Sequence, residues 1–227
     1  MSRQHGETTT MKTLYIFLTR SGTLLSNLVY SLTGAQYTHV SLAFDEDLST
    51  LYSSTRKNGY TMFPAGPSRE YLNRGVFLMR ENIPCALYAL EVTDEAYTRA
   101  KRRTQHMMHH GELYRFNSLG LLLCWMHIRW QRRRHYFCSQ FVSEVLQKSG
   151  ALELPKPSTL MHPSDYAELP ELRCLYRGTL AGLPPAPEHG AGRGGERHGP
   201  LPERPSGGCE GQSASAVLIF SKFLPKN

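Results

Sequence analysis

The sequence has few cysteines, and their arrangement is not that of a small fold held together by cross-links. Its 227 residues include five cysteines, at positions 85, 124, 138, 174 and 209, with irregular spacing and no Cys-x-x-Cys pair. This pattern argues against a disulfide scaffold and against a structural zinc site. We therefore expect a protein of a reducing compartment, and the sequence predicts a cytoplasmic location.

Long apolar runs are also missing. The run near the N-terminus, Leu14 to Leu18, is short and lacks a following small-residue cleavage site, so it predicts a first strand rather than a signal peptide. The longest run, Ser118 to Ile128, is too short to cross a bilayer as a helix. We expect a buried helix with an amphipathic rim there. Because Trp125, Trp130 and several arginines flank it, an anionic membrane surface is the alternative partner for this segment.

Acidic residues are outnumbered by basic ones. The chain has 26 Lys and Arg against 19 Asp and Glu, a formal net charge of +7, and its basic residues cluster at Lys101–Arg103 and Arg129–Arg134. This bias favours anionic partners, although a solvated basic face is the alternative interpretation. No known nucleic-acid motif surrounds either cluster, so nucleic acid is not expected as a partner.

The sequence predicts one folded domain with flanking segments. Alternation and β-branched or aromatic residues predict strands, whereas helical spacing between cap and stop signals predicts helices. The expected strands are 13–19, 39–44, 50–56, 75–80 and 85–92, followed by a last strand before Gly178; the expected helices are 23–34, a helix capped by Thr93 and ended by Gly111, and one beginning at Cys138. Sixteen of the residues 178–215 are Gly or Pro. Too few of the remaining residues are apolar for this segment to form a core. The predicted organisation is therefore a disordered 1–10, a domain over 11–177, a disordered 178–215 and a short hydrophobic tail at 216–227.

Two segments carry the candidate chemistry. In "HYFCSQFVSEVL", Cys138 stands at the start of the predicted helix, where the N-terminus favours a thiolate. In "YTHVSLAF", His39 lies on a predicted strand and could supply an imidazolium that stabilises the same thiolate. Neither residue is specific by itself, because a cysteine on an apolar helical face is commonly a core residue.

Together these segments resemble the circularly permuted papain-like amidases, the YiiX/YaeF-type relatives of NlpC hydrolases and of lecithin retinol acyltransferase, in which the histidine precedes the cysteine. The resemblance runs from about Leu14 to Tyr176. It implies an α+β fold of the permuted papain-like (NlpC-type) kind, with an antiparallel sheet packed against helices that include the cysteine-bearing helix. It also implies Cys138 as the nucleophile and His39 as the general base and acid.

The resemblance further implies a polar residue on the next strand that orients the histidine. The turn "DEDLST" is about two residues longer than usual, and a shift of two residues keeps the side chain on the same face of the strand. The matching position is therefore Ser53, with Tyr52 and Ser54 as alternatives. The segment "YRFNSLG" is similar to one whose tyrosine hydroxyl assists the oxyanion hole, which nominates Tyr114. The backbone N–H of Cys138 is a second candidate donor.

The function predicted from these residues is a cysteine hydrolase that cleaves an amide or related acyl bond of a small amide, peptide or acyl substrate through a thioester. A lipid-directed thiol acyltransferase and a non-catalytic binding module on the same fold are the alternatives. No cofactor is expected. His106 and His110 have the spacing of a metal-binding pair on a helix, but without nearby carboxylates they are interpreted as an exposed polar face.

Overall fold

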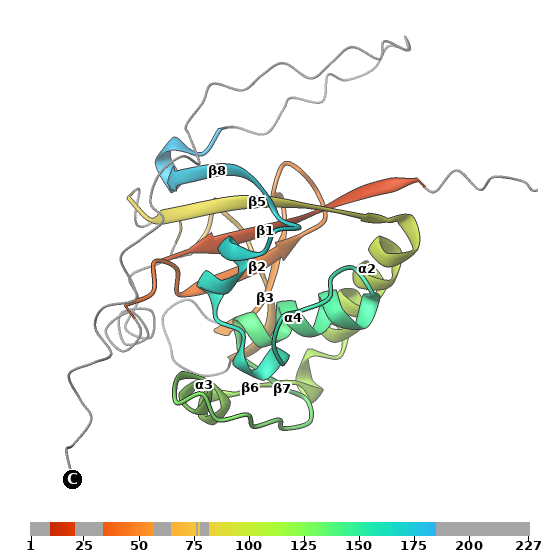
Figure 1. Ribbon diagram of the computed structural model, residues 1–227, viewed down its shortest axis with the longest axis vertical. Helices are drawn as coiled ribbons and strands as arrows, with labels where there is room; N and C mark the ends of the chain where they lie inside the picture. The colour runs from red at the N-terminus through yellow and green to blue at the C-terminus, as the bar shows by residue number, and fades with distance from the viewer. Residues whose placement is uncertain (1–9, 21–33, 57–64, 76, 78–81, 185–227) are drawn as a thin grey trace, which may run out of the picture.

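β1, Met11–Thr19, lies at the centre of a six-stranded antiparallel sheet (Figure 1). The computed structural model describes residues 10–20, 34–56, 65–75, 77 and 82–184. Within them the strands follow the spatial order β4-β3-β2-β1-β5-β8, and every neighbouring pair is antiparallel. The other strands are β2 His39–Ala43, β3 Leu51–Arg56, β4 Ala65–Glu70, β5 Pro84–Thr93 and β8 Arg173–Thr179.

Helices lie together on one side of this sheet (Figure 1). They are α2 Asp94–His109, α3 Ser118–Trp125 and α4 Cys138–Ser149, and a small parallel pair, β6 Arg115–Phe116 with β7 His135–Tyr136, brings the start of α3 beside the start of α4. Short 3-10 turns occupy Gly111–Leu113, Ser158–Leu160, Pro163–Glu168 and Leu180–Gly182. The fold is therefore α+β, as the sequence predicts.

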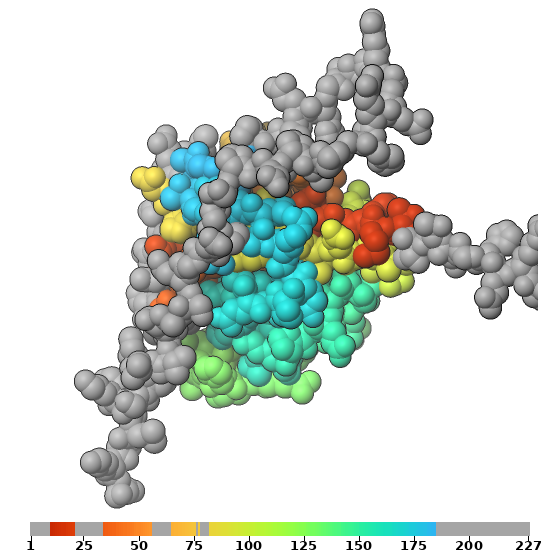
Figure 2. All heavy atoms as spheres, turned by 45° about the horizontal axis from the view of Figure 1, so that its top comes forward, coloured from red at the N-terminus to blue at the C-terminus, as the bar shows by residue number. Residues whose placement is uncertain are grey.

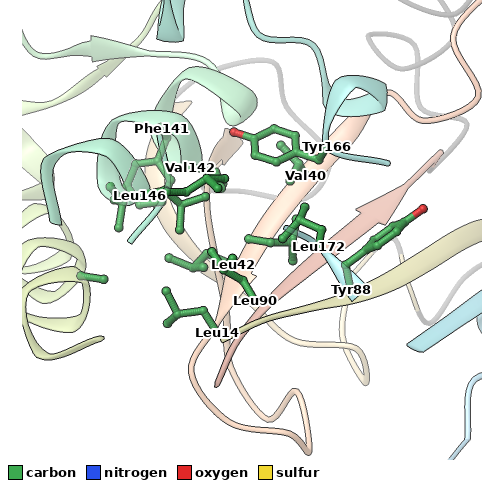
Figure 3. Close-up of a cluster of buried hydrophobic side chains, with 14 of the residues drawn as sticks. Leu14, Val40, Leu42, Tyr88, Leu90, Phe141, Val142, Leu146, Tyr166 and Leu172 are labelled. Atoms are coloured by element: carbon green, nitrogen blue, oxygen red, sulfur yellow. The ribbon is translucent and has the colours of Figure 1, made fainter. Parts of the chain in front are cut away.

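The main core fills the space between the sheet and α4. Phe141, Val142 and Leu146 of α4 point toward Val40 and Leu42 of β2 (Figure 3), and all five side chains are fully buried. Burying an aliphatic or aromatic side chain of this kind contributes roughly 1.5–3 kcal/mol. This packing fixes α4, and with it Cys138, against the strand that carries His39.

Polar contacts attach α4 to α2. Arg103 Nη2 lies 2.8 Å from Glu144 Oε1, and Arg99 Nε donates to the carbonyl of Ser149 at 2.8 Å, where a helix C-terminus favours a cation. Gly150 then ends α4 in the left-handed conformation, with φ +73°. α4 is thus held along its length as well as on its apolar face.

Most of the predicted elements are confirmed where the structure describes them. The strands expected at 13–19, 39–44, 50–56 and 85–92 are present, and Thr93 caps α2 by accepting from the N–H of Ala96 at 3.2 Å. α2 ends at His109, just before the predicted stop. The helix expected at 23–34 and the strand expected at 75–80 lie largely outside the described residues, as do 1–9 and 185–227.

The structure differs from the sequence analysis in three places. β4 was not predicted, because "AGPSRE" contains Gly, Pro and charged residues that disfavour strands. The folded domain extends past residue 177, since β8 reaches Thr179 and the turn Leu180–Gly182 follows. Finally, α3 buries only Gly120 and Cys124, so it is not the buried helix expected from its composition.

Candidate active site

Cys138 is the first residue of α4, directly after the extended residue Phe137. The first N–H groups of a helix have no acceptor within the helix, and together with the helix dipole they create a positive potential at this end. Cys138 as a whole residue keeps 9% of its surface exposed, in contrast to the fully buried residues of the next turn. Cys138 therefore lies at the edge of the core.

His39 begins β2 and lies close enough to the Cys138 side chain for the two groups to interact electrostatically. Burial lowers the pKa of His39, but the negative charge of Glu70, its hydrogen bonds to the ring and the nearby Cys138 side chain together outweigh burial and raise the pKa to about 10. The imidazole is therefore held in its protonated form at neutral pH. The structure brings together the two residues that the sequence paired.

Glu70, the last residue of β4, contacts the His39 ring through its carboxylate. Its two carboxylate oxygens are 2.9 and 3.1 Å from Nε2 of His39, and both side chains are 15% exposed. Because β3 stands between β2 and β4 in the sheet, the carboxylate reaches His39 from one strand farther away than the sequence prediction allowed. A partly buried carboxylate at this distance orients the ring and stabilises its charge.

Ser41 completes this cluster. It follows His39 by two positions on β2, so both side chains are on the same face of the strand. The Ser41 hydroxyl donates to Oε2 of Glu70 at 2.6 Å and lies 3.2 Å from Nε2 of His39. Ser41 is fully buried, and its bond holds the carboxylate against the imidazole.

The structure places Ser53 elsewhere. The Ser53 hydroxyl donates to the carbonyl of Val40 at 2.8 Å, and the Ser54 hydroxyl donates to the carbonyl of Tyr136 at 2.7 Å. These bonds tie β3 to β2 and to the segment before α4. The third alternative, Tyr52, packs its ring edgewise on Phe44 with centroids 5.6 Å apart. Glu70 and Ser41 contact the His39 ring, whereas the Ser53 hydroxyl donates to a main-chain carbonyl.

Two tyrosines lie near the start of α4. The half-buried ring of Tyr114 packs against Tyr136, with centroids 6.1 Å apart, and an oxyanion role for its hydroxyl stays a prediction. Tyr166, which the sequence analysis did not single out, donates to the carbonyl of Ser139 at 3.0 Å and lies 2.7 Å from the hydroxyl of Ser143. It thereby anchors the first turns of the cysteine-bearing helix.

A second cysteine–histidine contact provides an internal comparison. Cys124 Sγ lies 3.7 Å from Nε2 of His162. Here burial raises the pKa of the Cys124 thiol to about 12 and lowers the pKa of His162. Both groups are therefore favoured in their neutral forms. The two histidines differ because hydrogen-bonded contact with Glu70 outweighs burial at His39, whereas burial outweighs the charge of Asp165 at His162.

Local sequence signals could not have identified Glu70. It ends a segment with poor strand propensity, and its partner is 31 positions away, so only the sheet order brings the two side chains together.

Comparison of the chain with protein-family models and with curated proteins finds no match. None of the helices among the described residues is both long and apolar enough to span a bilayer. Within that same part of the chain, no group of three or more His, Cys, Asp or Glu residues is placed to hold a metal ion.

Proposed function

We propose that this protein is a cysteine hydrolase that cleaves an amide or related acyl bond, and that its α+β domain is a permuted papain-like (NlpC-type) fold. The observation that carries the proposal is the chain of contacts Glu70–His39–Cys138 at the start of a buried helix. Glu70 takes the orienting role that the sequence assigned to Ser53.

Electrostatics support a reactive thiol in this arrangement. The Glu70 carboxylate stabilises the His39 imidazolium, whose pKa is raised to about 10 despite burial. The imidazolium and the N-terminus of α4 in turn stabilise a thiolate on Cys138. The thiolate, and not the thiol, is the competent nucleophile.

The proposed reaction proceeds in two steps. In the first, Cys138 Sγ attacks the acyl carbon, and the bond to the leaving amine or alcohol breaks as the His39 imidazolium gives it a proton. The product is a thioester on Cys138. In the second, neutral His39 takes a proton from water as the water oxygen attacks the thioester carbon. The carboxylic acid leaves, and the proton on His39 restores the thiolate–imidazolium pair.

The tetrahedral intermediates need donors for their oxyanion. We assign this role to the backbone N–H of Cys138, since a helix start leaves such groups directed outward. The Tyr114 hydroxyl remains the proposed second donor.

The alternatives differ in their support. A non-catalytic binding module would be favoured by a weak orienting residue such as serine, and the Glu70 carboxylate against His39 disfavours it. A lipid-directed acyltransferase would use the same thioester with an acceptor other than water. The exposed apolar surface of α3, close to the start of α4, favours retaining this second function.

An acyl-trapping experiment tests the proposal. The protein is incubated with p-nitrophenyl butyrate, and release of p-nitrophenol and butyrylation of each cysteine are followed by absorbance and peptide mass spectrometry. We expect butyrylation at Cys138 that is lost in Cys138→Ala and retained in the matched variant Cys124→Ala, which removes the other cysteine in contact with a histidine. Equal acylation of Cys138 and Cys124, or acylation of Cys138 that persists in His39→Gln, would contradict the proposal.

A further inference from the structure

α3 and the residues after it present an apolar surface to solvent. Their large side chains have between 37% and 52% of their surface exposed, and we call them the apolar patch: Leu119, Leu122, Trp125, Met126 and Ile128. They make up five of the seven exposed large hydrophobic residues among those the structure describes. Such clustering is typical of an interaction site, whereas single exposed hydrophobic residues are ordinary.

The orientation of α3 is fixed by contacts with the rest of the protein. Asn117 accepts from the N–H of Gly120 at 3.0 Å and donates to Oε1 of Gln140 on α4 at 3.1 Å. Farther along, Cys124 contacts His162. These contacts hold the Gly120 and Cys124 side of the helix against the protein, so the opposite, leucine-bearing side must face outward.

Basic residues adjoin the apolar patch. We call the exposed arginines of the neighbouring loop and of β6 the basic rim: Arg115, Arg129, Arg132, Arg133 and Arg134. The N–H of Arg115 donates to the carbonyl of Arg134, which brings β6 next to the loop. No Asp or Glu occurs between Glu112 and Glu144, so no acidic residue of this segment offsets the charge.

We propose that the apolar patch and the basic rim dock this protein on an anionic lipid membrane. Leucine, tryptophan and methionine side chains enter the boundary between headgroups and acyl chains, while arginines bind the lipid phosphates. The yellow-green α3 region lies at one edge of the molecule in Figures 1 and 2, away from β8. Because Asn117 joins α3 to α4, docking brings the start of the cysteine-bearing helix close to the membrane.

A membrane accounts for both parts of this surface better than other occupants do. A second copy of the chain, paired about a two-fold axis, would place one basic rim near another and repel it. A nucleic acid would neutralise the arginines but would leave the aliphatic side chains without an apolar partner. An anionic bilayer satisfies the charge and covers the apolar side chains at once.

The chain's own tryptophans report on docking. Its only two, Trp125 and Trp130, lie in or beside the apolar patch. Intrinsic fluorescence is recorded as the full-length protein is titrated with vesicles of phosphatidylcholine, alone or mixed with phosphatidylserine, and binding is quantified by co-sedimentation. We expect a blue shift and binding with the anionic vesicles, weakening as salt is raised. No binding to anionic vesicles, or equal binding to neutral ones, would overturn the proposal.

Matched variants separate this surface from general effects of charge and hydrophobicity. Met126→Glu should abolish the blue shift, whereas Met11→Glu, at an equally exposed methionine on β1, should not. Arg133→Glu should weaken binding by about fivefold or more, from the contribution of one basic residue near an anionic surface. Arg173→Glu, at an exposed position on β8, is its control. Membrane docking would be refuted if the test and control variants had equal effects on binding. It would also be refuted if sedimentation showed a dimer that Met126→Glu dissociates.

Discussion

Replacing Glu70 by glutamine removes one negative charge from the candidate site while nearly preserving the shape of the side chain. In the wild type, both carboxylate oxygens lie within 3.1 Å of Nε2 of His39, and neither side chain is more than 15% exposed. An opposite charge at such a distance shifts a pKa by about 1–3 units. The pKa of His39, about 10 in the wild type, should therefore fall by about that much in Glu70→Gln.

The same change alters stability in a pH-dependent way. The pKa of His39 is raised in the folded protein above its ordinary value of 6.5, so its contribution is complete below pH 6.5 and is lost as the pH rises through about 10. A fall of about 1–3 units corresponds to roughly 1.4–4 kcal/mol of unfolding free energy. The deficit of Glu70→Gln should thus be full in mildly acidic solution, while Glu70 is still ionised, and should shrink toward strongly alkaline pH.

Two measurements follow this prediction. NMR titration of the His39 ring protons gives its pKa, and urea unfolding at acidic and alkaline pH gives the free energies. Glu112→Gln is a matched control, because Glu112 is 3.8 Å from His110 but its side chain is 68% exposed, and such surface pairs contribute little. If His39 titrates at the same pH in wild type and Glu70→Gln, the assignment of Glu70 as its stabilising partner is refuted.

Three further substitutions test the supports of the site. Ser41→Ala removes the 2.6 Å bond to a partly buried carboxylate and should lower the unfolding free energy by about 1.5–3 kcal/mol in urea titrations; an unchanged midpoint would contradict it. Tyr166→Phe leaves the Ser139 carbonyl and the Ser143 hydroxyl without their partner, so a loss of about 1–3 kcal/mol is expected, together with slower alkylation of Cys138 as the first turn of α4 loosens. Gly150→Ala places a side chain at φ +73° and should cost about 1–2 kcal/mol by thermal unfolding, whereas an equal or higher melting temperature would show that the helix end adapts.

The cysteine-bearing helix could be predicted from the sequence because its signals are local. Phe141, Val142, Val145 and Leu146 repeat at helical spacing, and Gly150 marks the end; the structure confirms both. Thr93 is likewise a local signal, because it was predicted to cap α2 and does so in the structure. The pairing of His39 with Cys138 was predicted from the order of two short segments; in the structure the Cys138 side chain lies near enough to His39 to contribute to its raised pKa.

The remaining features depend on contacts between residues distant in sequence. Glu70 lies in a strand that its own residues disfavour, and only the order β4-β3-β2 brings it to His39. Ser53 satisfied the expected spacing, but its hydroxyl is used to join strands. α3 is apolar almost all round, so its pattern indicates no buried face; the bond between Asn117 and Gln140 decides which side turns outward.

The most direct test of the central claim is the rate at which iodoacetamide alkylates each free cysteine of the reduced protein in mildly acidic solution, measured by peptide mass spectrometry. Cys138 should react far faster than Cys124, because the histidine beside Cys138 is held in its protonated form, whereas burial raises the pKa of the Cys124 thiol to about 12. His39→Ala should remove this advantage and leave Cys124 unchanged. Alkylation of Cys138 no faster than that of Cys124, or indifferent to His39→Ala, would contradict the account and return Cys138 to the role of a core residue.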